Sequence, residues 1–248
     1  MTSDLLTART ITITGAGGDS IEAYLAAPDS PTPRGSIVVL HHMPGYDRAV
    51  KETTRRFAEL GYTAICPNLY SREAPGASPD DAAAAARANG GVPDDRLVGD
   101  VEGALSYLRG QDSSNGKVGV IGFCSGGRQS FLAATSLPLD AAIDCYGAFV
   151  VGEPPEGMSW KVGPIVDRAA TLSCPLLGLF GAEDTHPSPA DVGVLAQALK
   201  ANGKEYEFHS FENAGHAFFA VDRPAYRPQA AVEGWEIIGD FLARHLST

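Results

Sequence analysis

The hydrophobic positions of this chain form short apolar runs that alternate with amphipathic stretches and with loops rich in Gly and Pro. Residues 9–14 and 20–26 alternate apolar and polar side chains on either side of a Gly-rich turn, which predicts a β-hairpin. Residues 36–40 and 62–66 are continuous apolar runs, typical of strands buried on both faces. Other apolar runs predict further strands at residues 117–123, 141–145, 175–180 and 205–211.

Apolar residues spaced three and four apart predict helices between these strands, at residues 48–60, 79–87, 94–109, 125–136, 189–201 and 230–245. Strands that alternate with helices after an N-terminal antiparallel hairpin predict an α/β fold, with a mostly parallel sheet and helices on both faces. No internal repeat and no long linker divides the chain. We therefore expect residues 1–248 to form a single domain without a large separate cap.

Residues 118–127 join an apolar strand to a predicted helix through Gly-x-Cys-x-Gly. This is the context of a nucleophile elbow, with cysteine in the position of the better-known serine. The strained turn needs glycines because the backbones of strand and helix approach closely there. The dipole of the helix that follows favours a thiolate. We therefore predict that Cys124 is a nucleophile, with an inert small residue in a packed turn as the alternative.

A thiol nucleophile needs a base, and the base needs an orienting carboxylate. In parallel sheets such groups lie in loops beyond the carboxyl ends of the strands. His216 follows the last predicted strand and is the predicted base. Asp184 is the predicted carboxylate, with Glu183 facing outward, because the turn that begins at Gly181 directs a short side chain back over the sheet. The order Cys124, Asp184, His216 is that of α/β-hydrolases. A histidine without a role and a solvated carboxylate are the alternatives.

The balance of charge limits the partners that the chain can have. The net charge is -11, from 30 Asp and Glu against 19 Lys and Arg, which argues against nucleic acid and anionic membranes. Residues 1–8 lack the apolar core of a signal peptide, and no apolar run approaches the length of a membrane span. We expect a cytoplasmic protein with a small-molecule substrate. Monomer and homodimer both remain open.

The remaining cysteines and the adjacent histidines predict no metal and no cofactor. Cys66, Cys145 and Cys174 lie in or beside apolar runs, without CxxC or His/Cys ligand spacing, and are expected to be buried reduced thiols. His41 and His42 are neighbours, but adjacent side chains leave a strand end in different directions and no third ligand is evident.

Short motifs that run in order along nearly the whole chain resemble those of one known family. They are CPNLY at 66–70, APG at 74–76, SNGKVG at 114–119, GFCSGG at 122–127, GAED at 181–184 and AGHAF at 214–218. With these motifs the chain resembles the dienelactone hydrolase (carboxymethylenebutenolidase-like) family of the α/β-hydrolase superfamily. Cysteine in the elbow is unusual outside that family.

The resemblance implies a Cys–His–Asp hydrolase that cleaves a lactone or an activated ester through a thioester acyl-enzyme. It also implies an oxyanion hole made by the backbone N–H groups of Ser125 and Met43. Members that open dienelactone have a Glu beside the nucleophile, where this chain has His42. We expect His42 to tune the thiol or to contact substrate, or else only to line its loop.

Family members also use two arginines for the carboxylate of the substrate. Arg87 falls where one of them is expected, whereas Ala220 stands at the position of the other. Tyr46 and Phe219 are further candidates for substrate binding, as aromatic residues of the loops around the site. Both departures, at His42 and at Ala220, weaken the case for a dienelactone substrate.

Two other kinds of protein would fit parts of this pattern. One is a non-catalytic binding protein with a hydrolase fold. The other is a redox-sensing thiol protein, which would need a resolving cysteine near Cys124. None of the other cysteines is close to Cys124 in sequence.

Overall fold

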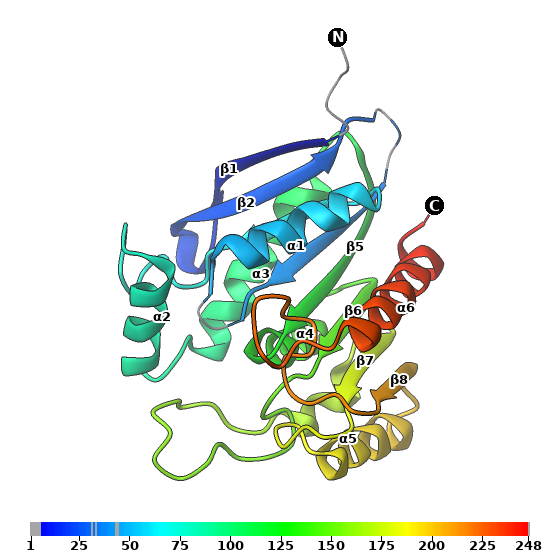
Figure 1. The fold of residues 1–248 in the computed structure, drawn as a ribbon. Helices are drawn as coiled ribbons and strands as arrows, with labels where there is room; N and C mark the ends of the chain where they lie inside the picture. Colours follow the sequence, from blue (N-terminus) through cyan, green and yellow to red (C-terminus); the bar gives the residue numbers. More distant parts are fainter. Residues whose placement is uncertain (1–5, 31, 33, 43–44, 248) are drawn as a thin grey trace.

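One twisted sheet runs through the molecule (Figure 1). The computed structural model describes residues 6–30, 32, 34–42 and 45–247, and within them the strand order is β1-β2-β4-β3-β5-β6-β7-β8. In Figure 1 the hairpin of β1 and β2 lies at one end, and β8 with α5 lies at the other. The strands are β1 (Leu6–Thr14), β2 (Ser20–Pro28), β3 (Arg34–Leu40), β4 (Thr63–Pro67), β5 (Ser114–Phe123), β6 (Ala141–Cys145), β7 (Leu176–Gly181) and β8 (Tyr206–Phe211).

The pairing of the strands sets where their loops meet. β1 pairs antiparallel with β2, in a register from Leu6 opposite Pro28 to Thr14 opposite Ser20, and β2 pairs antiparallel with β4. The strands from β4 through β3 to β8 are parallel to one another. Their carboxyl ends therefore share one edge of the sheet. The prediction of a mostly parallel sheet with an N-terminal antiparallel hairpin is confirmed.

Helices connect these strands close to the predicted positions. The last helix begins earlier than predicted, at a proline, which suits the first turn because that position needs no backbone N–H. Two short 3-10 helices were not predicted. None of the helices in the described ranges is long and apolar enough to cross a membrane. The helices are η1 (Ala16–Gly18), α1 (Arg48–Glu59), α2 (Pro79–Ala88), α3 (Asp94–Arg109), α4 (Ser125–Ser136), η2 (Val166–Thr171), α5 (Pro189–Ala201) and α6 (Pro228–Leu246).

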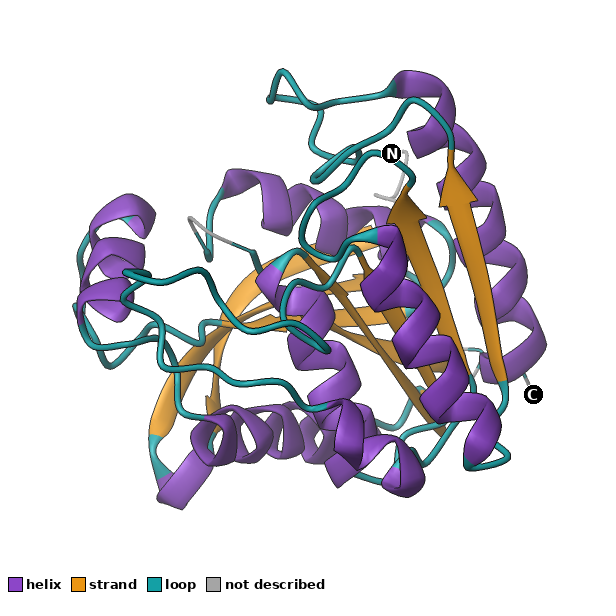
Figure 2. Ribbon diagram, turned by 90° about the horizontal axis from the view of Figure 1, so that it is seen from below, coloured by secondary structure: helices purple, strands orange, loops and turns teal. Residues whose placement is uncertain are grey.

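Alternate residues of the central strands serve two separate cores. In β3, Val38 and Leu40 belong to a cluster that includes side chains of α3, α4 and α5. Ile37 and Val39 belong to another cluster, with side chains of α1 and α6. This two-residue period is the reason why the central strands are apolar throughout. Figure 2 shows the resulting layers, with helices on both sides of the sheet.

Candidate active site

Cys124 lies in a strained turn between β5 and α4. Its backbone has φ 57° and ψ -121°, a conformation that side-chain-bearing residues rarely adopt. Its N–H donates to the carbonyl of Cys145 on β6 at 3.0 Å, and its own carbonyl accepts from the N–H of Gly127 at 2.9 Å. These bonds hold the thiol at the carboxyl end of β5 and at the first turn of α4, where the helix dipole favours negative charge.

Two glycines make this turn sterically possible. A Cβ on Gly122 would lie 1.8 Å from the carbonyl oxygen of Gly126, and a Cβ on Gly126 would lie 2.4 Å from that of Leu40. Contacts this short involve rigid backbone, so the neighbours cannot move aside cheaply. The steric reason for the Gly-x-Cys-x-Gly motif is thus the close approach of α4 to β5 and β3.

Asp184 and His216 meet from loops that follow β7 and β8. Asp184 is 5% exposed, and its Oδ2 accepts the Nδ1–H of His216 at 2.9 Å. Its Oδ1 accepts the backbone N–H of His186, also at 2.9 Å. Glu183, one residue earlier, is exposed to solvent. The turn therefore directs Asp184, and not Glu183, toward His216, as the sequence predicts.

His216 connects Asp184 to Cys124. Because its Nδ1 is engaged with Asp184, its Nε2 is left for the Cys124 side chain, which acts on the pKa of His216. Burial alone would lower the pKa of His216. The hydrogen bonds to Asp184 and Cys124 and the charges of both groups outweigh burial and raise that pKa to about 10. The environment thus stabilises an imidazolium beside the thiol.

Aromatic rings form the wall behind the imidazole. The Tyr146 ring lies edge-on to His216, with centroids 5.2 Å apart, and 6.2 Å from the Phe219 ring. Phe219 also lies edge-on to Phe123, the residue before the nucleophile, at 5.7 Å. Burial raises the pKa of the Tyr146 phenol, so it stays neutral. Phe219 is therefore a buried neighbour of the site, and its contact with substrate stays a prediction.

The loop after β3 carries two further candidates. His42 Nε2 lies 3.7 Å from Oδ2 of Asp47, whose Oδ1 caps α1 by accepting the Val50 N–H at 2.9 Å. Tyr46 is buried in the apolar cluster of α1 and α6, with the Lys51 ammonium 4.1 Å from its ring centroid. Met43 lies outside the described residues. The roles of His42, Tyr46 and Met43 toward the substrate and its oxyanion stay predictions.

Arg87 lies in the last turn of α2 and is exposed. Its charge acts on the hydroxyl of Tyr70, which also lies within electrostatic range of Cys124. Arg87 and Cys124 thus both act on Tyr70, and the contact of Arg87 with substrate stays a prediction.

His41, unlike His42, belongs to the interior. It is fully buried, and its Nε2 accepts the backbone N–H of Leu69 at 3.1 Å. Burial lowers its pKa to about 4, so the ring is neutral and fixes the loop after β3 to the segment after β4. Within the described residues no group of three His, Cys, Asp or Glu side chains is arranged to hold a metal.

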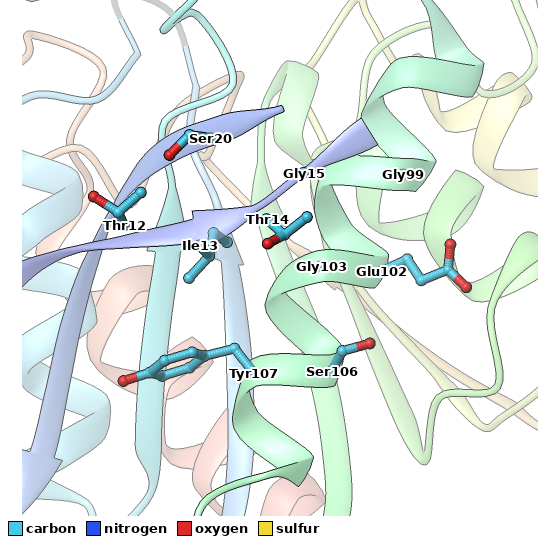
Figure 3. Close-up of a pocket in the computed structure, with 10 residues that line it drawn as sticks. All are labelled: Thr12, Ile13, Thr14, Gly15, Ser20, Gly99, Glu102, Gly103, Ser106 and Tyr107. Atoms are coloured by element: carbon cyan, nitrogen blue, oxygen red, sulfur yellow. The ribbon is translucent and has the colours of Figure 1, made fainter. Parts of the chain in front are cut away.

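A larger hollow lies away from these residues, between the hairpin and α3 (Figure 3). It has a volume of about 600 Å³ and is open to solvent, with Thr12 and Ser20 on the hairpin side and Glu102 and Ser106 on α3. Among its described lining residues there is no cysteine or histidine. It therefore lacks the thiol and imidazole of the predicted triad, and we place the candidate active site at Cys124.

Comparison of the sequence with known protein families agrees with a hydrolase site at Cys124. The family model of the dienelactone hydrolase family matches residues 21–246. The chain belongs to the dienelactone hydrolase family. Its membership makes it a lactone or ester hydrolase with a small-molecule substrate, and the alternative of a non-catalytic binding protein is not retained.

Individual relatives of the dienelactone hydrolase family cover nearly the whole chain. A Methylorubrum extorquens protein named "Putative carboxymethylenebutenolidase" is 33% identical over 230 residues, which are 91% of this chain and 77% of that protein. The Pseudomonas putida carboxymethylenebutenolidase is 29% identical over 238 residues, 94% of this chain and 95% of the relative. A crystal structure titled a "Putative Dienelactone Hydrolase", from Klebsiella pneumoniae, has a TM-score of 0.85 and 30% identity, covering 98% of this chain and 100% of that one. The α/β-hydrolase fold is confirmed.

This dienelactone hydrolase family member carries a buried carboxylate that our sequence reasoning missed. Asp144 on β6 is fully buried, its Oδ1 accepts the N–H of Gly147 at 2.7 Å, and its Oδ2 has no hydrogen-bond partner among the described residues. Burial raises its pKa to about 7, although the Gly147 N–H and the charge of His216 act to lower it. The signal in the sequence was one acidic residue inside an apolar strand.

The position of Cys145 is relevant to the alternative of a redox-sensing thiol protein, which would need a resolving cysteine near Cys124. Its carbonyl accepts the Cys124 N–H, so the two residues are backbone neighbours although they are 21 positions apart (145 minus 124). The Cys145 thiol is fully buried, which raises its pKa well above that of a free cysteine. A buried protonated thiol is a poor partner for disulfide exchange, because the thiolate is the reactive form.

Proposed function

We propose that this protein hydrolyses a lactone or an activated ester through Cys124, His216 and Asp184, with a thioester acyl-enzyme as intermediate. The observation that carries the proposal is the hydrogen bond between Asp184 and His216, whose pKa is raised by Asp184 and by the Cys124 side chain at the elbow. A nucleophile, a base and an orienting carboxylate in this relation are what acyl transfer by a thiol requires.

The first half of the reaction forms the thioester. The Cys124 thiolate, paired with protonated His216, attacks the carbonyl carbon, and the carbonyl π electrons move to the oxygen. When the tetrahedral intermediate collapses, the C–O bond to the leaving group breaks. The departing enolate or alkoxide takes the proton from His216, which leaves the imidazole neutral.

The second half consumes water. Neutral His216 removes a proton from a water molecule as the water attacks the thioester carbonyl, and the C–S bond breaks to release the acid. The thiolate and the imidazolium are then restored. Asp184 stays ionised throughout, because its task is to hold the imidazole in one orientation and to stabilise its positive charge.

The oxyanion of both tetrahedral intermediates needs hydrogen-bond donors. Ser125 is the first residue of α4, so its backbone N–H has no acceptor one turn earlier within that helix. We assign the Ser125 N–H to the oxyanion, together with that of Met43 as the family resemblance implies. Each such donor typically contributes a rate factor of about 10²–10³.

The nucleophile also limits the substrate. A thiolate is a better leaving group than a simple alkoxide, so the tetrahedral intermediate returns to substrate unless the ester has a good leaving group. Enol, aryl and strained lactone esters meet this requirement. We further propose that the chain acts as a single domain in the cytoplasm, without metal or cofactor.

Turnover of an aryl ester such as 4-nitrophenyl acetate by single variants tests the proposal. Cys124→Ala should lose at least about 10³-fold in kcat/KM, because the bond-forming atom is removed. Cys174→Ala is the matched control, since that half-buried thiol lies beside the core of α4 and α5 and should leave turnover unchanged. Retained turnover in Cys124→Ala would overturn the proposal.

A further inference from the structure

A small cavity begins one residue beyond the nucleophile. Ser125, Arg128 and Gln129, which are spaced three and four apart and so share one face of α4, form its polar wall. Leu97 and Trp160 contribute apolar surface. The space within is about 30 Å³, enough for one or two water-sized groups. The cavity therefore suits a small substituent close to the scissile carbonyl.

Three polar atoms of this wall are buried without a partner among the described residues. They are Ser125 Oγ, Arg128 Nε and Gln129 Oε1. Ser125 is only 7% exposed and Arg128 only 4%. Burying a polar group without a hydrogen bond is unfavourable, so three such groups on one helix face indicate a polar occupant.

The charge of the wall is already balanced. Both terminal nitrogens of Arg128 donate to Asp94, Nη1 to Oδ1 at 2.9 Å and Nη2 to Oδ2 at 3.1 Å, and Nη2 also donates to the Gly163 carbonyl. Asp94 itself lines the cavity. A carboxylate placed here would face the carboxylate of Asp94, and Arg128, the cation among the described lining residues, is already paired with Asp94. The occupant is therefore uncharged.

The three unpaired atoms of the cavity also indicate which kind of uncharged group it binds. A Gln129 oxygen needs a donor, the Arg128 Nε–H needs an acceptor, and the Ser125 hydroxyl serves as either. A hydroxyl group, which donates once and accepts twice, answers all three. A ketone or an ether has no proton for Gln129, and an alkyl group leaves all three atoms unpaired.

We propose that this cavity binds a hydroxyl group on the acyl part of the substrate, so that the enzyme acts on esters or lactones whose acyl part carries a free hydroxyl. This inference rests on the proposed function, because it assumes that the acyl group attached to Cys124 extends along α4.

Aryl esters with one leaving group and different acyl groups test this assignment. We compare 4-nitrophenyl butanoate, each enantiomer of 4-nitrophenyl 3-hydroxybutanoate, and the 4-nitrophenyl monoester of succinic acid. One hydroxy enantiomer should exceed butanoate in kcat/KM by about tenfold or more, since one good hydrogen bond in a dry site is worth that factor. The succinate ester should be the slowest. Equal rates for the butanoate and both hydroxybutanoates would overturn the proposal, and so would a preference for the succinate ester.

Substitutions in the cavity test whether it causes the preference for the hydroxybutanoate ester over the butanoate ester. Gln129→Leu should reduce the ratio of hydroxybutanoate to butanoate rates at least about fivefold. Gln197→Leu, on an exposed turn of α5, is the matched control and should keep the wild-type ratio. Ser125→Ala should lower the ratio as well, which covers the case in which Gln129→Leu fails to fold. An unchanged ratio in both variants would contradict the assignment.

A binding measurement separates this inference from the proposed mechanism. Calorimetry with the Cys124→Ala protein compares 3-hydroxybutyramide with butyramide and needs no turnover. Tighter binding of the hydroxyamide, by about tenfold, supports the cavity even if Cys124 proves not to be the nucleophile. Equal binding overturns the cavity assignment even if turnover depends on Cys124.

Discussion

His216 donates its Nδ1–H to Oδ2 of Asp184 across 2.9 Å, from the loop after β8 to the loop after β7. This bond selects the tautomer of the imidazole, and so leaves Nε2 for the thiol of Cys124. Glu183, the residue before Asp184, is exposed, so a substitution of Glu183 serves as a control for a substitution of Asp184.

Replacing the carboxylate should disturb the imidazole without changing the volume of the side chain. We expect Asp184→Asn to lower kcat/KM for an activated ester by about 10²–10⁴-fold, because an amide at this position favours the wrong tautomer. Glu183→Gln should leave the rate unchanged. A similar rate for both variants and the wild type would show that Asp184 has no role in orienting the base.

The pH dependence of the rate follows from the same contact. Proton delivery to the leaving group requires the imidazolium, and the pKa of His216 is raised to about 10. The value of kcat/KM should therefore fall as the pH rises through about 10. In Asp184→Asn the carboxylate no longer raises this pKa, so the alkaline limb of the profile should move to lower pH. An alkaline limb at the same pH in both proteins would contradict the assignment of that limb to His216.

Much of this arrangement could be predicted from the sequence because it depends on local rules. The apolar runs and the helical spacing located the strands and helices, with α3, α4 and α5 at the predicted bounds. The preference for Asp184 over Glu183 also followed from the length of one turn. These features depend on residues that are near one another in the chain.

The features that were missed depend on contacts between distant segments. The pair of Arg128 and Asp94 joins α4 to α3, 34 positions apart, and no local pattern marks it. The burial of the Tyr46 ring beside Lys51 also depends on the fold, and the contact of Tyr46 with substrate stays a prediction. Nor could the sequence distinguish the interior His41 from its neighbour His42, because the distinction depends on the Leu69 N–H.

The buried Asp144 should make stability depend on pH. Its pKa is raised from 3.8 to about 7, mainly by burial, so the folded state keeps a proton that the unfolded state loses above pH 4. Its contribution to stability is greatest below about pH 4, decreases as the pH rises from about 4 to about 7, and changes no further above that. Asp144→Asn removes this dependence. At pH 5 we expect the variant to exceed the wild type by only about 1–2 kcal/mol, because little more than one pH unit separates pH 5 from the unfolded-state pKa of 3.8.

At pH 8.5 Asp144→Asn should be more stable than the wild type, by up to about 4 kcal/mol. Urea unfolding of both proteins at pH 5, 7 and 8.5 measures the difference. Titratable groups that do not interact with Asp144 affect both proteins alike and cancel. Parallel pH profiles for the two proteins would show that Asp144 does not hold a proton in the folded state.

The elbow should tolerate no side chain at Gly122. In Gly122→Ala the new Cβ would meet the Gly126 carbonyl, so we expect a loss of more than about 3 kcal/mol in the free energy of unfolding. Gly239→Ala in α6 is the control, because its Cβ would meet nothing within 4 Å. That change should stabilise the protein by about 0.5–1 kcal/mol, as alanine does in a helix. Denaturant unfolding of both variants measures the contrast, and equal stability would contradict the tight elbow.

The central claim is that Cys124 carries the acyl group during turnover. Rapid acid quench of the enzyme mixed with an activated ester, followed by mass spectrometry of its peptides, tests this most directly. We expect the mass of the acyl group on the peptide that contains Cys124, appearing within the first turnover and absent from Cys124→Ala. Turnover at the wild-type rate with no acylated Cys124, or an acyl group on another residue, would contradict the account.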